Sequence, residues 1–193
     1  MTVLDMAATT IAYGAPELSR MSAAFADLAR FLRLPVFSTA GCSDAKAFDE
    51  QGAAEAAFSL LAAGLSGAHL IHDVGYLEGG LAGSLELLVA ADELIGMARR
   101  ILRGIEVTPV TLAASVVADV GPGGHYLDWD HTVTQFRREL WFPRLMDRTR
   151  FDSWRAAGAT TLADRARQRA LELLRDYARE PLEAGVLREL QAI

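Results

Sequence analysis

One glycine-rich stretch carries acidic and aromatic residues at a spacing that suits chemistry. Asp73, Tyr76 and Glu78 follow the apolar segment 68–74, whose composition favours a strand buried on both faces. A carboxylate beside an aromatic face can hold a cation, and a carboxylate can also move a proton. In an α/β barrel the reaction takes place at the loops that follow the strands. We therefore expect catalytic groups in this stretch, with His72 and Asp73 at the end of the strand.

A second polar loop follows an earlier segment that resembles a strand. Asp44 and Lys46 lie in loop 40–46, directly after segment 34–39. Their charges can position a substrate carboxylate or carry protons, and a local ion pair or a helix-start cap explains them equally well. His72 also has a structural alternative, because a buried histidine bonded to the backbone is more common than a catalytic one.

The elements that position these residues form strand–loop–helix units. After the strand 68–74 and its loop 75–83, Ser84 can cap a helix that runs over 85–103 and ends at Gly104. The apolar stripe of this helix is expected at Leu85, Leu88, Val89, Ile95, Ala98 and Leu102. Strand, polar loop and helix together form the repeating unit of an α/β barrel.

Two similar units precede this one in the chain. The first has a strand at 2–7 and a helix at 16–33, which Pro16 begins. The second has a strand at 34–39 and a helix at 49–63. The buried face of the first helix is expected at Leu18, Met21, Phe25, Leu28, Ala29 and Leu32. Three consecutive units imply parallel strands joined by right-handed crossovers.

Beyond residue 107 the pattern predicts helices alone. We expect them at 109–121, 131–140, 152–157 and 162–179 and after Pro181, with a glycine-rich turn at 121–126. The expected fold class is therefore α/β, with βα units over 1–107 and an α-helical appendage over 108–193. Three strands are too few for a barrel of eight, and they would leave apolar sheet edges exposed.

Composition and charge narrow the class of protein. The chain has 193 residues, of which 51% are hydrophobic, and this suits one compact domain without a membrane span. Cys42 is the only cysteine, so disulfides are excluded, and the histidines lack the close spacing of a metal site. The N-terminus has no basic segment typical of a signal peptide, so we expect a cytoplasmic protein. The net charge of −6, without a basic stripe, makes nucleic acid an unexpected partner.

A set of short strings gives the chain a specific likeness. They lie at 12–17 (AYGAPE), 34–36 (LPV), 41–46 (GCSDAK), 70–78 (LIHDVGYLE), 99–107 (RRILRGIEV), 120–125 (VGPGGH) and 143–145 (PRL), with Asp147 and Arg148. In this combination the chain resembles the trimethylamine methyltransferase family as far as about Arg179. Members of that family move a methyl group from a methylated amine to a corrinoid protein.

The resemblance implies a larger fold and a function. Family members are usually far longer, so the sequence resembles only their C-terminal part, about three βα units of a TIM barrel. The implied donor is a tertiary or quaternary methylated amine, such as trimethylamine or a betaine, and the acceptor is Co(I) of a corrinoid. Because the chain lacks the Asp-x-His-x-x-Gly corrinoid-ligand motif, the corrinoid should belong to a partner protein. The expected further partner is an N-terminal barrel half or another copy of the chain. The alternative function is that of a truncated, non-catalytic remnant acting as an assembly or regulatory module.

The implied chemistry assigns roles to the polar loop residues. The site must hold a cation, orient one methyl group and exclude water. Asp73, Glu78 and His72 are the expected catalytic residues. Substrate contacts are expected from Tyr13, Tyr76, Asp44, Lys46, His125 and Tyr126. Ordinary loop packing is the alternative for each of these residues, and for Glu78 it is a brace for the glycine loop. Some members carry pyrrolysine and demethylate trimethylamine, whereas this chain has only standard residues, which by family analogy favours betaines.

Overall fold

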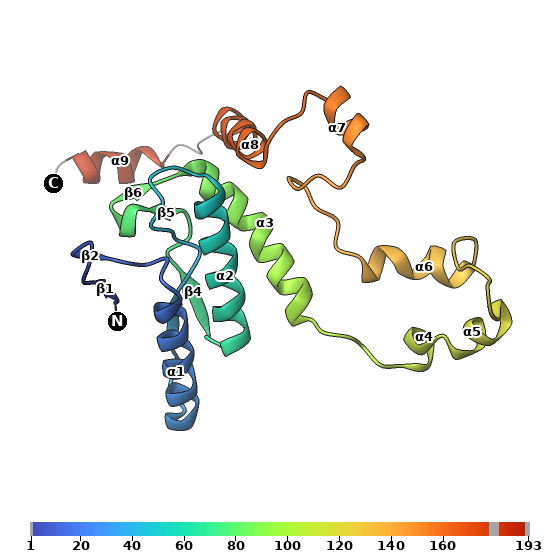
Figure 1. Ribbon diagram of the computed structural model, residues 1–193. Helices are drawn as coiled ribbons and strands as arrows, with labels where there is room; N and C mark the ends of the chain where they lie inside the picture. The colour runs from blue at the N-terminus through green and yellow to red at the C-terminus, as the bar shows by residue number, and fades with distance from the viewer. Residues whose placement is uncertain (1, 178–181, 192–193) are drawn as a thin grey trace.

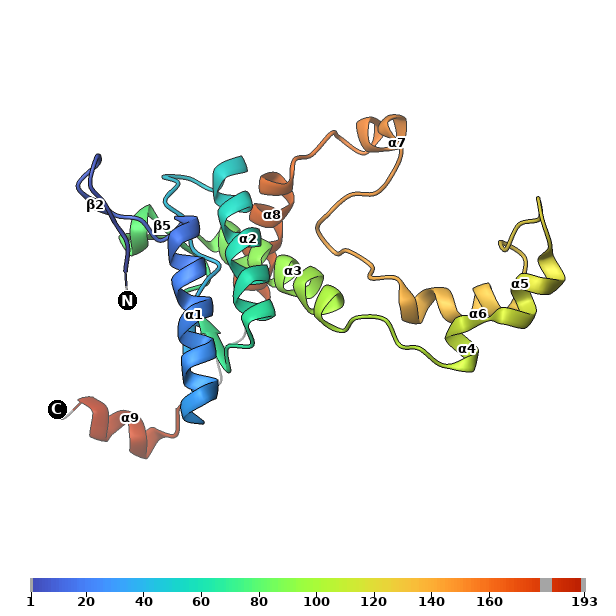
Figure 2. The ribbon, with the colours of Figure 1, turned by 60° about the horizontal axis from the view of Figure 1, so that its bottom comes forward.

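The structure, a computed structural model, describes residues 2–177 and 182–191 and shows a mixed α/β chain of open shape (Figure 1). Three helices and a pair of parallel strands form a small body. A long helical segment leaves this body and then returns to it (Figures 1 and 2). None of the helices in the described residues is both long and apolar enough to cross a membrane.

Two βα units form the centre of the body. β3 (Phe37–Thr39) leads into α2 (Glu50–Ser66), and β4 (Leu70–His72) leads into α3 (Leu85–Leu102). The two strands are parallel, as the sequence predicts for these units. α1 (Pro16–Leu32) packs against α2, and α2 packs against α3. The structure therefore confirms two of the three expected units.

The ends of these helices follow the predicted caps. The Ser84 hydroxyl accepts the N–H of Leu87 at 3.0 Å and begins α3, and Gly104 follows the last turn with a φ of +69°. Asp49 caps α2 in the same way by accepting the N–H of Gly52. Such caps satisfy amides that have no partner within their own helix.

The expected first barrel strand at 2–7 is wrong. In its place, β1 (Leu4–Asp5) pairs antiparallel with β2 (Thr10–Ile11) in a small exposed hairpin. The cause is local, because the Asp5 carboxylate accepts the N–H groups of Ala7 and Ala8 and turns the chain back. The described chain thus contains two parallel βα units, preceded by this hairpin and by α1.

The loop expected at 75–83 also has more structure than predicted. β5 (Tyr76–Leu77) pairs antiparallel with β6 (Ala82–Gly83), and a 3₁₀ turn over Glu78–Gly80 joins them. Leu77 is buried in this hairpin and packs into the core of the body. The expected burial of the preceding strand is also wrong, because Leu70 is 62% exposed.

The buried faces of α1 and α3 agree only in part with the predicted stripes, of which Leu18, Ala29 and Ala98 are buried. The side chains that α1 buries are mostly small, namely Leu18, Ser22, Ala26 and Ala29. α3 buries Leu87, Ala90, Ala91, Glu93, Leu94 and Ala98. Small side chains let the helices approach closely, and several larger predicted core residues, including Phe25, Leu28 and Leu88, are left exposed. The large apolar face of each helix is therefore available to polypeptide outside this body.

The helical appendage begins as an arm that projects from the body. α4 (Pro109–Leu112) and α5 (Ala114–Val120) replace the single helix expected at 109–121, because the chain breaks at Ala113 with a φ of +47°. α6 (Asp130–Glu139) runs back toward the body, followed by α7 (Phe151–Ala156) (Figure 1).

The chain then returns to the body. α8 (Leu162–Asp176) packs against α3, and α9 (Ala184–Gln191) lies beyond it. The last residues of the helix expected at 162–179 fall outside the described residues.

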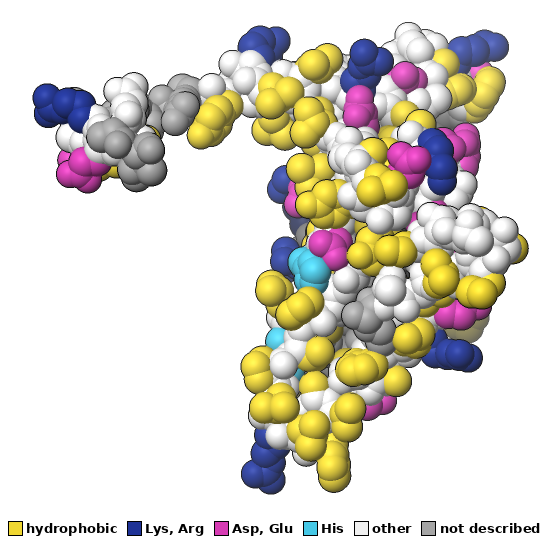
Figure 3. Space-filling view, turned by 90° about the vertical axis from the view of Figure 1, so that its left-hand side faces the viewer, with side chains coloured by type: hydrophobic (Ala, Val, Ile, Leu, Met, Phe, Trp, Pro, Cys, Tyr) yellow, Lys and Arg dark blue, Asp and Glu magenta, His cyan; other side chains and the backbone are white. Residues whose placement is uncertain are grey.

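The chain exposes far more surface than a compact protein of its mass. Its accessible surface is 13868 Å², whereas a compact monomer of this mass exposes about 8,900 Å². Apolar side chains gather over the lower part of one face, where α1 and the strand pair lie (Figure 3). Phe25, Phe31, Phe37 and Leu70 are each more than half exposed. Exposed apolar surface of this extent is typical of an interaction site.

Candidate functional site

The two faces of the β3–β4 pair have different surroundings. In the parallel register Phe37 lies opposite Leu70, and Thr39 lies opposite His72. These four side chains share one face, because side chains alternate along a strand. Ser38, which is buried, lies on the other face, toward the helices. The face that carries Phe37 and His72 is therefore the one that the helices leave uncovered.

A hydrogen-bonded cluster sits at the carboxyl ends of the two strands. One carboxylate oxygen of Asp73, Oδ2, accepts the Thr39 hydroxyl at 3.0 Å, and the other, Oδ1, lies 2.8 Å from Nδ1 of His72. The His72 ring also meets the ring of Phe37 edge-on, with centroids 4.7 Å apart. Nε2 of His72 is buried and has no hydrogen-bond partner among the described residues. Two of the predicted catalytic residues, His72 and Asp73, are thus in direct contact.

Asp73 adopts a backbone conformation that non-glycine residues rarely take. Its φ is +73°, in the left-handed region. Aspartate tolerates this region better than most residues, but the conformation still has a cost. The bonds to Thr39 and His72 hold the carboxylate in one orientation despite that cost. The cluster is therefore a fixed negative group, 27% exposed at its carboxylate side chain.

The loops that follow the two strands are joined by backbone hydrogen bonds. Ala40 donates to the carbonyl of His72, and Ser43 donates to the carbonyl of Tyr76. In the opposite direction, Gly75 donates to Gly41, and the N–H of Glu78 donates to Ala45. Loop 40–46 is almost wholly buried as a result. The two loops thus form one rigid platform beneath the cluster.

Burial in this platform determines the state of the single cysteine. Cys42 is fully buried, and removal from water, with a further contribution from the Asp73 carboxylate, raises the pKa of its thiol to about 12. The thiol is therefore protonated and unreactive at neutral pH.

Asp44 is engaged by the backbone of the segment before α1. Its two carboxylate oxygens accept the N–H groups of Tyr13 and Gly14, at 2.8 and 2.9 Å. The Lys46 ammonium, which is exposed, donates to the carbonyl of Asp44 at 2.6 Å. These contacts agree with a structural role for Asp44, and they hold Tyr13 at the carboxyl side of the strands.

Glu55 is a residue of this region that sequence reasoning missed. Its Oε2 accepts both the Ser43 hydroxyl at 2.6 Å and the N–H of Asp44 at 2.8 Å. Gly14 lies so close to this carboxylate that an added Cβ would fall 2.2 Å from the same oxygen. Glu55 therefore ties α2 to the platform. The only signal in the sequence was one acid inside an alanine-rich helix.

The remaining predicted site residues divide into two groups by position. The Tyr13 ring packs against Gly80, and Tyr76 and Glu78 are exposed on the adjacent hairpin. Among the described residues, no hydrogen bond is formed by the Glu78 carboxylate, so the brace alternative finds no contact there. His125, in contrast, lies near the outer end of the arm, where its ring is 3.3 Å from the carboxylate of Asp128.

Tyr126 also lies near the outer end of the arm, next to His125. The chain therefore gathers Tyr13, Asp44, Lys46, Tyr76 and Glu78 near one end of the strands, and leaves His125 and Tyr126 apart from them. No group of three or more histidine, cysteine or acidic side chains in the described ranges could hold a metal ion.

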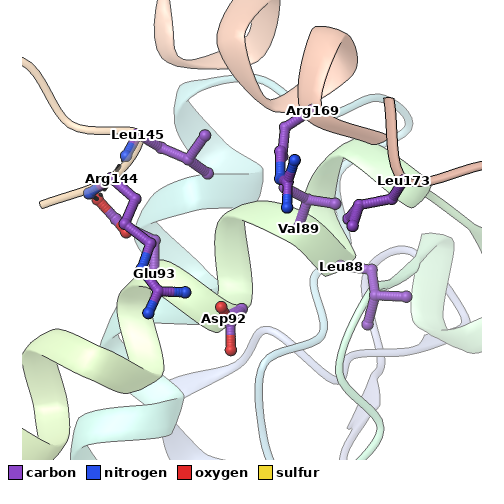
Figure 4. Close-up of a pocket in the computed structure, with 8 residues that line it drawn as sticks. All are labelled: Leu88, Val89, Asp92, Glu93, Arg144, Leu145, Arg169 and Leu173. Carbon is purple, nitrogen blue, oxygen red and sulfur yellow. Dashed lines mark hydrogen bonds between the residues drawn. The ribbon is translucent and has the colours of Figure 1, made fainter. Parts of the chain in front are cut away.

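Glu93 is a second missed residue, and it fixes the chain where it returns from the arm. It is 5% exposed on α3, and its Oε1 accepts the N–H groups of Arg144, Leu145 and Met146 at 2.8–3.0 Å. Figure 4 shows it beside a pocket of about 810 Å³ between α3, α8 and this returning segment. The sequence signal was the pair Asp92–Glu93 within an otherwise apolar stretch of helix.

Comparison with known proteins finds relatives over the whole chain. The family model of trimethylamine methyltransferase matches residues 1–193. The chain is 35% identical to the trimethylamine methyltransferase of Methanosarcina barkeri strain Fusaro, over 100% of this chain and 39% of that protein. It is 33% identical to the trimethylamine methyltransferase of Desulfitobacterium hafniense strain DCB-2, over 100% of this chain and 38% of that protein. It is 34% identical to the glycine betaine methyltransferase of Desulfitobacterium hafniense strain Y51, over 97% of this chain and 39% of that protein. The chain thus spans about two fifths of the length of these curated relatives.

Proposed function

The chain belongs to the trimethylamine methyltransferase family, and we propose that it forms part of an enzyme that moves a methyl group from a methylated amine to the corrinoid of a partner protein. The observation that carries the proposal is the Thr39–His72–Asp73 cluster at the carboxyl ends of two adjacent parallel strands. In barrels built from βα units, the reaction takes place at this end of the strands. The cluster also lies on the strand face that the helices leave open.

The reaction requires little covalent chemistry from the protein. The carbon–nitrogen bond to one methyl group breaks, and its electron pair stays on nitrogen. The reduced cobalt of the partner's corrinoid, which is the second substrate, supplies the electron pair for the new bond to carbon. A quaternary ammonium leaves as a neutral amine and needs no general acid. The site must therefore hold the cation, direct one methyl outward and exclude water.

The cluster and its neighbours suit the task of holding a cation. The Asp73 carboxylate is fixed by Thr39 and His72, so it places a negative charge at one point without reorganisation. Tyr13 and Tyr76 offer aromatic faces at the same end of the strands, and such faces attract quaternary ammonium groups by about 0.5–2 kcal/mol. We assign the substrate cation to Asp73 and these aromatic side chains.

The rest of the reaction chamber must come from polypeptide outside the body described here. Within the part of the chain that the structure describes, β3 and β4 each have an unpaired edge, and an apolar groove runs along each side of the pair. One groove lies between α1 and β3 and includes Phe25 and Phe37, and the other lies between β4 and α3 and includes Leu70. Because both edges are open, the pair suits the inside of a larger parallel sheet. We propose that a complementary barrel half supplies the neighbouring strands.

A complementation assay tests this function. The chain is combined with the N-terminal barrel half of a family member, and methyl transfer from trimethylamine and from glycine betaine to a reduced corrinoid protein is followed by the cobalt absorbance. We expect transfer from at least one donor by the mixture and none by either half alone. If the halves associate stably but transfer no methyl group from either donor, the chain is instead a non-catalytic assembly or regulatory module.

The role of Glu78 is tested in the same assembled protein. Glu78 has a backbone φ of +51°, and its exposed carboxylate has no hydrogen-bond partner among the described residues, so Glu78→Gln should leave the melting temperature unchanged. If Glu78 helps to hold the cation, the variant should lose methyl transfer several-fold or more. Glu17→Gln, an exposed acid at the start of α1, is the matched control. A variant of Glu78 that melts early but transfers methyl at the normal rate would show a structural role.

A further inference from the structure

The arm that leaves the body is folded locally but buries none of its side chains. We define the acidic arm as residues 104–136, which include α4, α5 and the start of α6. Thr108 and Thr111 cap α4 reciprocally, and the His131 ring lies 2.7 Å from the carbonyl of Val110, so α4 and α6 are tied together. No residue of the acidic arm is buried in the described structure. An arm with its own caps and no core is expected to pack on another surface.

The base of the arm is held at a fixed angle to the body. Arg100 and Arg103 at the end of α3 donate to the Glu139 carboxylate, and both also bind backbone carbonyls near the end of α6. Arg138 in α6 pairs with Glu106 in the segment that precedes α4. The arm therefore projects in a defined direction, and Figures 1 and 2 both place its outer end far from α8.

Charge is divided sharply between the arm and the segment that follows it. The acidic arm has four carboxylates and no lysine or arginine. Residues 137–175 have ten arginines and five carboxylates. The two segments are therefore complementary in charge, which guides association and fixes register. Within one chain the outer end of the arm does not reach α8, so the complementary surface must be that of another molecule.

The pocket beside Glu93 lies between α3 and that basic segment. It has a volume of about 810 Å³ and is bordered by Leu88, Val89 and Leu173 and by the charged groups of Asp92, Glu93, Arg144 and Arg169 (Figure 4). Three backbone N–H groups bind Oε1 of Glu93. No carboxylate of the described residues pairs with the Arg144 guanidinium. The pocket thus combines an apolar wall with an available cation.

The outer end of the arm carries an exposed apolar side chain beside an exposed acid. Leu127 is 83% exposed in the turn between α5 and α6, and Asp128 beside it is 75% exposed at its side chain. We propose that the acidic arm docks on a second copy of this chain, with Leu127 entering the pocket between α3 and α8 and Asp128 reaching Arg144. Because both copies have an arm and a pocket, the exchange can be reciprocal about a twofold axis.

The geometry favours a second copy over a segment that precedes residue 1. Such a segment joins the chain at the hairpin of β1 and β2, on the side of the body opposite the arm (Figures 1 and 2). Its point of attachment is therefore distant from the arm and from the pocket between α3 and α8. The proposal does not depend on the methyl-transfer function.

Cysteine cross-linking between two differently substituted full chains tests the docking. Chains with Leu127→Cys are mixed with chains with Leu173→Cys under mild oxidation, and Cys42 does not interfere because it is buried and its thiol pKa is raised to about 12. We expect a disulfide-linked dimer on a non-reducing gel. Leu171→Cys is the matched control, since it lies two residues away on α8, is 59% exposed and does not border the pocket. Equal cross-linking at both positions, or none at Leu173→Cys, overturns the proposal.

Charge reversal gives a second readout that does not depend on cysteine chemistry. Sedimentation of the chain with Arg144→Glu should show the dissociation constant of the dimer raised by about tenfold or more. Combining it with Asp128→Arg should restore the dimer, which a mere loss of folding could not do. If the unchanged chain sediments as a monomer across the concentrations tested, or if the double reversal fails to restore association, no second copy occupies the pocket.

Discussion

Removing the Glu93 carboxylate should release the segment that returns from the arm to the body. One buried oxygen of this side chain accepts three consecutive backbone N–H groups, from Arg144, Leu145 and Met146. A hydrogen bond to a charged group contributes about 1.5–3 kcal/mol, and a neutral one about 0.5–1.5 kcal/mol. The three bonds share one oxygen, so their contributions do not add fully.

Two substitutions of Glu93 separate the effect of charge from that of the acceptor. Glu93→Gln keeps a carbonyl oxygen and should cost about 1–2 kcal/mol of local stability, whereas Glu93→Ala leaves three N–H groups without a partner and should cost roughly 3 kcal/mol or more. Hydrogen exchange of the amides at 144–146 measures this directly. A loss of 3 kcal/mol corresponds to exchange faster by about a hundredfold.

The control for this prediction is the neighbouring acid on the same helix. Asp92 is exposed and forms no hydrogen bond among the described residues, so Asp92→Ala should leave exchange at 144–146 unchanged. If the amides at 144–146 exchange in Glu93→Ala at the same rate as in the unsubstituted chain, the three hydrogen bonds do not hold this segment in place.

Three further predictions follow from the platform and from α8. The Cys42 thiol, with its pKa raised to about 12 by burial, should resist alkylation at pH 8 in the folded chain and react at once in denaturant, as mass spectrometry would show. Gly75→Ala should destabilise the chain by about 1–3 kcal/mol in urea unfolding, because Gly75 has a φ of +90° and an added Cβ would lie 3.0 Å from Leu88. Gly104 also has a positive φ, but an added Cβ there would meet no other atom. Gly104→Ala therefore measures the backbone contribution alone. Hydrogen bonds from the Thr161 hydroxyl and N–H lower the pKa of Asp164. The ionised Asp164 therefore stabilises α8 above the ordinary carboxyl range, and this stabilisation is lost as the pH falls below about 4. Circular dichroism should show a loss of helix in that range, and the loss should be smaller in Asp164→Asn.

Local signals predicted the centre of the fold well. α3 begins after Ser84 and ends before Gly104, as expected, and the apolar runs around Ile71 and Ser38 form the two parallel strands. These features depend on residues close in sequence, because caps and strand periodicity act over a few positions. The first strand failed for an equally local reason, since Asp5 forms a turn that the apolar pattern of 2–7 conceals.

Features that depend on distant contacts were harder to predict. The stripe on α1 was expected to include Phe25 and Leu28, yet both are about half exposed, whereas the predicted Leu18 and Ala29 are buried together with Ser22 and Ala26. Periodicity identifies apolar faces but does not say which of them meets a helix of the same body. Phe25 and Leu28 therefore belong to an apolar face that no helix of this body covers.

In the candidate site, too, residues recognisable from their local position were predicted, and residues that bind distant segments were missed. His72 and Asp73 were predicted from their position at a strand end, and they are bonded to one another. Glu55 and Glu93 were missed, because each binds backbone amides from a segment distant in the chain. A single acidic residue in a helix does not predict which distant backbone amides it binds. His125 lies on the arm, away from the cluster, and its expected substrate contact stays a prediction.

Methyl transfer by an assembled protein with Asp73→Asn tests the central claim most directly. Asparagine keeps the size of the side chain and can still accept the Thr39 hydroxyl, but it removes the charge that we assign to holding the substrate cation. The chain with Asp27→Asn, an exposed acid on α1, serves as the control. We predict that single-turnover transfer from the methylated amine to the reduced corrinoid protein falls at least about tenfold with an unchanged melting temperature, which corresponds to 1.4 kcal/mol or more. Transfer at the control rate by a folded Asp73→Asn protein would contradict the assignment of the site.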